Sequence, residues 1–247
     1  VDLAGVLYVG DDAVPGAIEG LAHLRSANLP LRFLTNTTRS PRSTIIAKLK
    51  KLGFAIAEEE ILTAALATKM LVVQRSLRPH YLIHPDIAYE MGPNDLAPTV
   101  VVLGDAGNHF TYDALNAAFR LLMEGLPLLV MAKNRYFQEA DGLSLDMGAF
   151  VAALEFSAGV QAEVVGKPSR AYFEAALTDL GIDTSEAVMI GDDLADDIDG
   201  AQQAGIAGIL VRTGKFRPQD AYDPRIKPAL IADDFAAAVS AIIGEST

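Results

Sequence analysis

Residues 188–201 read VMIGDDLADDIDGA, and the rest of the chain is organised around this stretch. An apolar run that ends at Gly191 is typical of a strand buried on both faces of a parallel sheet. Five aspartates follow within eight positions, and Ile198, Ala201 and Ala204 then begin a helical period. The stretch therefore predicts a buried strand, an acidic turn and a helix.

The density of acidic residues in this turn has two explanations. Carboxylates packed this closely repel one another at neutral pH unless a cation or a lysine compensates their charge. The carboxyl end of a buried strand is also where open α/β sheets keep their sites, so a hard metal ion with oxygen ligands accounts for the pattern. A helix N-terminus, where acidic residues suit the dipole and the cap, explains one or two of the aspartates but not all of them. We favour the metal site.

Length and composition bound the class of protein. The chain has 247 residues, of which 51% are hydrophobic and 21% charged, as in a soluble globular protein with one large or two modest domains. The net charge of −12 argues against a nucleic-acid partner, because affinity for the phosphate backbone comes mainly from Lys and Arg. The absence of cysteine excludes disulfides and thiolate catalysis. Finding no signal peptide and no membrane-spanning run, we expect a cytoplasmic protein without a membrane partner, and we expect residues to precede Val1.

Strands and helices alternate along the chain as they do in a parallel α/β sheet. The rhythm restarts between about residues 79 and 161, which predicts a second α/β module inserted into the first. We therefore place a core domain at 1–76 and 163–247 and an inserted domain at 77–162. The main predicted strands are 29–34, 99–103, 128–131, 162–165, 188–191 and 206–211, and the predicted helices after the first, at Pro15, are 41–52, 63–75, 112–123, 148–156, 170–180 and 235–243.

Two more polar motifs follow predicted strands. Hydroxyl and backbone N–H groups of residues 35–38 are suitable ligands for a phosphate, although an ordinary loop has the same composition. Lys167 is either a surface lysine, the common case, or a counter-charge for phosphate and carboxylate at the same sheet edge as the aspartates. No dinucleotide-binding glycine motif, nucleotide P-loop or serine nucleophile elbow occurs.

Four pieces therefore stand in order at predicted strand ends: residues 2–6 (DLAGV), Thr35-Asn36, Lys167-Pro168, and Gly191-Asp192 with Asp197. Together they resemble the haloacid dehalogenase superfamily of phosphotransferases. The inserted module between the second and third pieces resembles the large α/β cap found in the NagD-like branch of this superfamily. The segments VGKPS and VMIGDD resemble haloacid dehalogenase-like hydrolase domain-containing proteins and their neighbours, the phospholysine phosphohistidine inorganic pyrophosphate phosphatases. The likeness covers essentially the whole chain and implies a Rossmann-like core with a parallel sheet and an inserted α/β cap domain.

The resemblance also implies a role for each motif in phosphoryl transfer. Asp2 would be the nucleophile that forms an aspartyl-phosphate. Thr35 and the backbone N–H groups around Asn36 would hold phosphoryl oxygens, and Lys167 would neutralise charge on the nucleophile and on the transferring group. The expected substrate is a small phosphorylated molecule.

The same resemblance implies a Mg²⁺ cofactor. Asp192 would bind the ion together with Asp2 and the backbone carbonyl of Ala4. Asp197 would hold Lys167 or a metal-bound water in place. Cap-mediated dimers occur in this branch, so a homodimer through the cap is a further expectation.

Ala4 departs from the family pattern. Most phosphatases of the family have a second aspartate two residues after the nucleophile, where it protonates the leaving oxygen and later activates water. A methyl group does neither, and such acid–base help is worth ~10²–10⁴-fold. One explanation is a substrate with a good leaving group, such as pyrophosphate, an acyl phosphate or a phosphoramidate. A degraded enzyme that binds a phosphorylated ligand or protein, and a substitution made to trap a complex, are the alternatives. The sequence favours a Mg²⁺-dependent phosphatase, because a pure binding module needs no nucleophile beside a metal.

Overall fold

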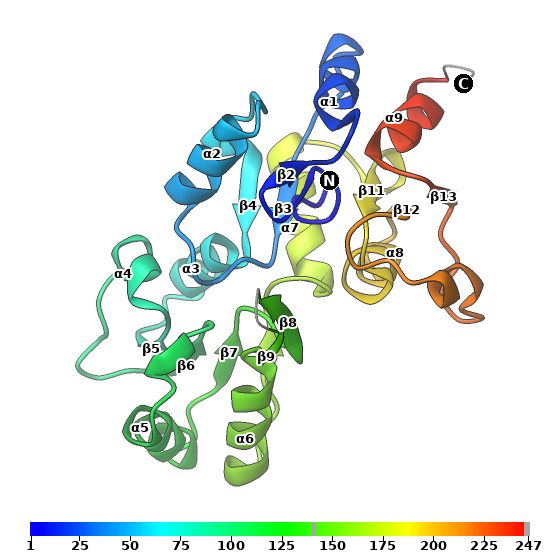
Figure 1. The fold of residues 1–247 in the computed structure, drawn as a ribbon. Helices are drawn as coiled ribbons and strands as arrows, with labels where there is room; N and C mark the ends of the chain where they lie inside the picture. Colours follow the sequence, from blue (N-terminus) through cyan, green and yellow to red (C-terminus); the bar gives the residue numbers. More distant parts are fainter. Residues whose placement is uncertain (140–141, 245–247) are drawn as a thin grey trace. The chain divides into compact units, whose positions relative to one another are not determined.

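The computed structural model describes residues 1–139 and 142–244. Strands and helices alternate and the sheets are mainly parallel, which confirms the predicted α/β class (Figure 1). By their contacts the residues group into two compact units. The first consists of Val1–Thr35, Ser43–Leu62 and Lys167–Thr247, and the second of Asn36–Arg42 and Thr63–Gly166.

The N-terminal segment runs through the sheet of the first unit. The N–H of Asp2 donates to the carbonyl of Ile190 at 2.9 Å, and the N–H of Leu34 donates to the carbonyl of Val1 at 2.8 Å. Asp2 pairs in parallel with Leu34, so this segment joins β3 to β11. β11, β12 and β13 continue the sheet in parallel. The strands of this unit are β1 (Tyr8–Val9), β2 (Asp12–Ala13), β3 (Phe33–Thr35), β4 (Ile61–Thr63), β11 (Val188–Gly191), β12 (Ala207–Val211) and β13 (Leu230–Ala232).

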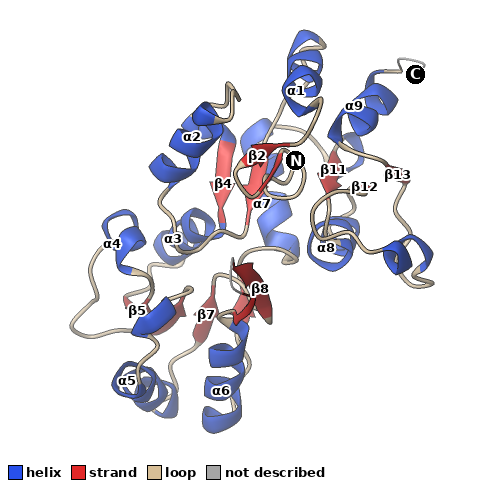
Figure 2. Cartoon of the chain, viewed as in Figure 1, coloured by secondary structure: helices blue, strands red, loops and turns tan. Residues whose placement is uncertain are grey.

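Helices pack on this sheet around a core of buried apolar side chains that includes Phe33 and Phe235. α1 and α9 lie side by side (Figures 1 and 2), and Gly20 of α1 leaves room for the ring of Phe235. The helices are α1 (Ala17–Ser26), α2 (Arg42–Lys51), α7 (Arg170–Leu180), α8 (Gly200–Gln203) and α9 (Phe235–Ile243). A π-helical turn, η4 (Leu194–Asp199), precedes α8, and the 3₁₀ turns are η1 (Glu58–Glu60), η3 (Thr184–Glu186) and η5 (Pro218–Tyr222).

The second unit has a four-stranded parallel sheet in the order β10-β7-β6-β5. Its core is apolar, with the rings of Phe110 and Phe150 stacked 4.0 Å apart at its edge. The strands are β5 (Pro79–Leu82), β6 (Val100–Leu103), β7 (Leu128–Val130) and β10 (Glu163–Val164), and β8 (Tyr136–Glu139) and β9 (Gly142–Leu145) form an antiparallel hairpin. The helices are α3 (Ala64–Gln74), α4 (Pro85–Met91), α5 (Tyr112–Met123) and α6 (Gly148–Ala158), with the 3₁₀ turn η2 (Gly107–His109).

Most predicted elements agree with the structure, and α5, α7, β11 and α9 have the predicted bounds. The strand predicted at 29–34 forms only at Phe33–Thr35, after Pro30, which has no N–H for a sheet ladder. The predicted domain bounds remain a prediction. The contacts place residues 36–42 and 63–76 with the second unit, where α3 packs on α4 and the Lys69 ammonium donates to the carbonyl of Glu90.

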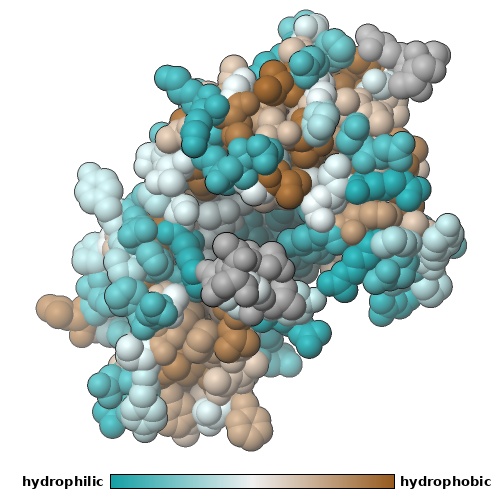
Figure 3. Space-filling model, in the orientation of Figure 1, coloured by the Kyte–Doolittle hydropathy of each residue, from teal (hydrophilic) through white to brown (hydrophobic). Residues whose placement is uncertain are grey.

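The surface of the second unit carries exposed apolar side chains. Figure 3 shows apolar surface where Figure 1 draws α6. Met123, the last residue of α5, and Phe156 of α6 are 60% and 91% exposed. Within residues 1–139 and 142–244, none of the helices combines the length and the apolar character needed to cross a membrane.

Candidate active site

Lys167 lies between two buried carboxylates in the first unit. Its Nζ donates to Oδ1 of Asp2 and to Oδ1 of Asp197, each at 2.6 Å. All three residues are buried, Lys167 to 5% exposure. Burial opposes the charged form of the lysine, but the charges of Asp197 and Asp2 outweigh it and raise the pKa of Lys167 well above its ordinary value. Lys167 is therefore a permanent cation in contact with the predicted nucleophile.

A third carboxylate, that of Asp192, completes an acidic cluster. One oxygen each from Asp2, Asp192 and Asp197 lies within 4.8 Å of the others. Burial, and then the charges of Asp2 and Asp197, raise the pKa of Asp192 to about 8. Burial also raises the pKa of Asp197 to about 6, although Lys167 opposes that shift. The cluster holds more negative charge than one ammonium offsets, and its donors are hard oxygen atoms, so the residues fit a divalent cation.

The aspartates in the turn after β11 have two different roles, since one caps a helix and two others belong to the acidic cluster. Oδ1 of Asp193 accepts the N–H groups of Ala195 and Asp196, each at 3.0 Å, and so caps η4. Oδ2 of Asp197 accepts the N–H of Asp193 at 3.1 Å, and a Cβ on Gly191 would overlap Asp197. Asp193 thus caps the helix, as the helix-cap explanation requires, whereas Asp192 and Asp197 belong to the acidic cluster.

Thr35 is buried at the end of β3, one residue beyond Leu34, the partner of Asp2 in the sheet. Its main chain is held by Tyr172, which the sequence does not single out. The Tyr172 hydroxyl accepts the N–H of Thr35 at 3.3 Å, donates to the carbonyl of Leu62 at 2.6 Å and has the carbonyl of Thr35 as a second acceptor at 3.1 Å. Thr35 therefore lies at the same sheet edge as Asp2, on a strand end fixed by a buried tyrosine.

Asn36 and Ala4 are the other two predicted site residues, and their contacts bear less directly on their predicted roles. Asn36 follows Thr35 but groups with the second unit, where its Oδ1 lies against Gly166. Ala4 is exposed. The N–H of Gly5 donates to the carbonyl of Tyr8 at 2.7 Å, which orients the peptide that links Ala4 to Gly5. The roles of Asn36 and of the Ala4 carbonyl stay predictions.

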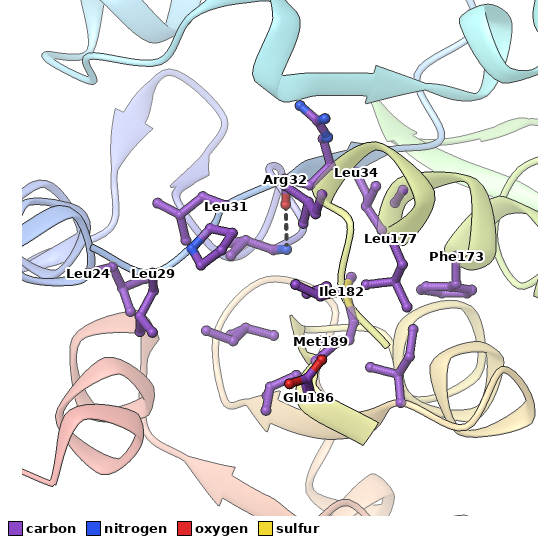
Figure 4. A pocket seen from close by; sticks show the side chains of 18 of the residues that line it. Leu24, Leu29, Leu31, Arg32, Leu34, Phe173, Leu177, Ile182, Glu186 and Met189 are labelled. Carbon is purple, nitrogen blue, oxygen red and sulfur yellow. Dashed lines mark hydrogen bonds between the residues drawn. The ribbon is translucent and has the colours of Figure 1, made fainter. Parts of the chain in front are cut away.

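A cavity of about 350 Å³ lies elsewhere in the first unit (Figure 4). Apolar side chains from α1, β3, α7 and β11 line it, among them Leu24, Leu34, Leu177 and Met189. The described residues that line it include no member of the acidic cluster. The candidate chemistry therefore lies outside this cavity.

Comparison with known proteins identifies the family. A family model described as haloacid dehalogenase-like hydrolase matches residues 1–107, and a HAD-hydrolase-like model matches residues 164–238. Haloacid dehalogenase-like hydrolase domain-containing protein 2 of Rattus norvegicus is 45% identical over 247 residues, 98% of this chain and 94% of the relative. The chain belongs to the haloacid dehalogenase-like hydrolases. The phospholysine phosphohistidine inorganic pyrophosphate phosphatase of Danio rerio is 42% identical over 250 residues, 98% of this hydrolase and 93% of the relative.

Solved structures share the fold of this hydrolase. The 4-nitrophenylphosphatase of Thermotoga maritima matches with a TM-score of 0.90 at 26% identity, over 98% of this chain and 95% of that one. NagD of E. coli K-12 matches with a TM-score of 0.88 at 25% identity over 95% of each chain, which confirms the NagD-like branch. A glycerol phosphate phosphatase of Mycobacterium tuberculosis in complex with magnesium matches with a TM-score of 0.85 at 25% identity, over 96% of this chain and 74% of that one.

Proposed function

We propose that this hydrolase is a Mg²⁺-dependent phosphatase that works through an aspartyl-phosphate on Asp2. The observation that carries the proposal is the buried cluster in which the Lys167 ammonium bonds to Asp2 and Asp197, with Asp192 beside them. A carboxylate held against a permanent cation at a sheet edge is suited to attack a phosphoryl group, because its charge and that of the substrate are both offset.

The metal would be held by Asp2, Asp192 and the backbone carbonyl of Ala4. These donors are oxygen atoms, which Mg²⁺ prefers, and the excess negative charge of the cluster favours a divalent cation. The bound ion supplies positive charge that offsets the charge of the phosphoryl group during transfer. A phosphatase of the same fold has been solved with magnesium, which supports this choice of ion.

The reaction proceeds in two displacements at phosphorus. In the first, a carboxylate oxygen of Asp2 forms a bond to phosphorus while the bond from phosphorus to the leaving group breaks, and the leaving group takes the electron pair. In the second, water attacks phosphorus and the bond from phosphorus to Asp2 breaks, so that Asp2 returns to a free carboxylate and phosphate leaves with the protons of the water. Lys167 offsets charge in both steps, Asp197 keeps the lysine in place, and Thr35 holds phosphoryl oxygens.

Ala4 restricts the substrate to phosphates with good leaving groups. The methyl group cannot protonate a leaving oxygen, and this missing help is worth ~10²–10⁴-fold for a poor leaving group. Pyrophosphate, acyl phosphates and phosphoramidates need less of it, because their leaving groups depart as stable species. The relative from Danio rerio is named as a phosphatase for phospholysine, phosphohistidine and inorganic pyrophosphate, which supports this class.

Ala4 also favours a second candidate, a protein that binds a phosphorylated ligand or partner and turns it over slowly. The test measures Mg²⁺-dependent phosphate release from pyrophosphate, acetyl phosphate, imidodiphosphate and simple alkyl phosphates. Asp2→Asn is the control. Release confined to the activated compounds, and abolished in the control, supports the enzyme. No release from any of them, even in Ala4→Asp, contradicts it in favour of the binding protein.

A homodimer and a cytoplasmic location remain proposals. The exposed apolar side chains of α5 and α6, including Met123 and Phe156, are the surface we propose for a second copy. Light scattering after size-exclusion chromatography, with Phe156→Ser as the variant, tests the dimer.

A further inference from the structure

The turn Thr213–Lys215 follows β12 and contacts both the nucleophile loop and the Asp192 carboxylate. Oγ1 of Thr213 donates to the carbonyl of Gly5. The N–H of Lys215 donates to Oδ2 of Asp192 at 2.6 Å. β12 pairs in parallel with β11, so the turn leaves the sheet at the edge where Asp192 stands. One short turn therefore joins two segments that are far apart in the sequence.

The carboxylate of Asp192 is enclosed by two glycines. A Cβ on Gly5 or on Gly214 would overlap Oδ2 of Asp192, and a Cβ on Gly214 would also overlap the backbone of Gly5. Both glycines have positive φ, +93° and +60°, which residues with a side chain rarely adopt. Asp192 is 1% exposed. The carboxylate thus cannot shift unless the turn or the nucleophile loop shifts with it.

The same turn also holds the peptide unit next to the one that carries the other proposed metal donor, the Ala4 carbonyl. Gly5 uses its N–H for the carbonyl of Tyr8 and its own carbonyl for Thr213. Because a peptide unit is planar, a fixed N–H on Gly5 also fixes the direction of the Ala4 carbonyl. Thr213 holds the next peptide unit along, so the orientation of this loop depends on both contacts.

We propose that the Thr213–Lys215 turn is a positioning element that sets the affinity of the site for a divalent cation, by holding the Ala4 carbonyl and the Asp192 carboxylate in one fixed relation. This inference rests on the metal site of the proposed function. Donors that are already ordered lose little conformational freedom when the ion binds, and affinity rises accordingly. The exposed ammonium of Lys215, 3.2 Å from Oδ2 of Asp193, is a surface pair of small effect, so the element acts through Thr213, Gly214 and the main chain.

The test is calorimetric titration of the whole, substrate-free chain with Mg²⁺ alone. Thr213→Val removes the hydroxyl at nearly constant volume. It is expected to raise the dissociation constant for Mg²⁺ by about threefold to tenfold, the range for one lost hydrogen bond. Thr213→Ser restores the hydroxyl and is expected to restore the affinity. Thr178→Val is the matched control, because its hydroxyl bonds to a carbonyl on the exposed side of α7.

The outcomes separate the inference from the proposed function. Wild-type affinity in Thr213→Val contradicts the role of the turn and leaves the Mg²⁺ site standing. No Mg²⁺ binding by the wild type at millimolar concentration contradicts both. Circular dichroism checks that the variants fold. If Thr213→Val does not fold, Thr213→Ala, which adds no branched side chain, takes its place.

Discussion

Lys167 and Asp2 stand 165 positions apart in the sequence, yet Nζ of the lysine lies 2.6 Å from Oδ1 of the aspartate. The same Nζ bonds to Asp197, so one buried ammonium serves two buried carboxylates. An arrangement of this kind is costly to break from one side, because the groups left behind stay charged without a partner.

Replacement of the lysine tests that cost. Lys167→Met is expected to lower the free energy of unfolding by ~3–5 kcal/mol and to reduce phosphate release to the level of Asp2→Asn. Urea denaturation and phosphate release measure the two effects. Lys133→Met is the matched control, because its ion pair with Glu155 lies at the surface and such pairs are worth ~0–1 kcal/mol. Equal stability of the two variants contradicts the prediction.

Asp192 is expected to make Mg²⁺ binding depend on pH. Its pKa of about 8 in the folded chain exceeds the ordinary 3.8, so the folded state binds more protons than the unfolded state between these values. The free energy of unfolding of the metal-free protein therefore decreases as pH rises from about 4 to about 8. Mg²⁺ must displace the proton from Asp192. The dissociation constant for Mg²⁺ is therefore expected to fall by up to ~tenfold for each unit by which pH rises below 8, and to level off above pH 8.

Titrations at pH 6, 7, 8 and 9 measure this dependence. Asp192→Asn is expected to remove Mg²⁺ binding and, at pH 8 and above, to raise the thermal midpoint of the metal-free protein, because it removes a buried charge. An affinity that does not change with pH would show that Asp192 is ionised before the ion arrives.

A carboxyl group at position 4 is expected to widen the substrate range. Ala4→Asp should raise hydrolysis of simple alkyl phosphates by ~10²–10⁴-fold and that of acetyl phosphate much less, because only the former needs its leaving oxygen protonated. Steady-state kcat values for the two substrates give the comparison. Ala4→Asn has a similar shape but no acid, and a gain in Ala4→Asn equal to that in Ala4→Asp would rule out acid catalysis as the cause.

Removal of the buried hydroxyl of Tyr172 is expected to loosen the end of β3. Tyr172→Phe removes the buried hydroxyl that accepts the N–H of Thr35 and donates to the carbonyl of Leu62, at a cost of ~1–3 kcal/mol in the free energy of unfolding. Since Thr35 would hold the phosphoryl group, KM for pyrophosphate should also rise. Tyr222→Phe, at an exposed tyrosine, should change neither quantity. A Tyr172→Phe variant with wild-type stability and KM would refute the assignment.

The parts of the structure that are visible in the sequence share one property: a strong local pattern. β11 has the predicted bounds because an apolar run of strand length meets a burst of acidic residues, and α5, α7 and α9 because each spans enough turns for a helical period. α4 has seven residues, too few for a period to stand out, and neither it nor the hairpin β8–β9 is predicted.

The residues of the site also differ in whether a local sequence pattern predicts them. Asp2, Lys167, Asp192 and Asp197 are predictable as a set because their motifs stand at predicted strand ends and the order of those motifs matches a family pattern. Tyr172 is not, since it occupies an ordinary helix position and its partners are main-chain groups 110 and 137 positions away. Gly5 and Gly214 are equally invisible as a pair, because only the fold brings the two turns against Asp192.

The interruption of the first unit between Leu62 and Lys167 has a consequence for synthesis of the chain. A ribosome adds ~5–20 residues per second, so Asp2 exists for on the order of ten seconds before its lysine has been made. Asp192 and the turn at 213–215 arrive later still. During that interval the proposed nucleophile has neither its counter-charge nor the other proposed ligands of the ion. Capture of Mg²⁺ by a nascent chain would therefore mark the last stage of folding.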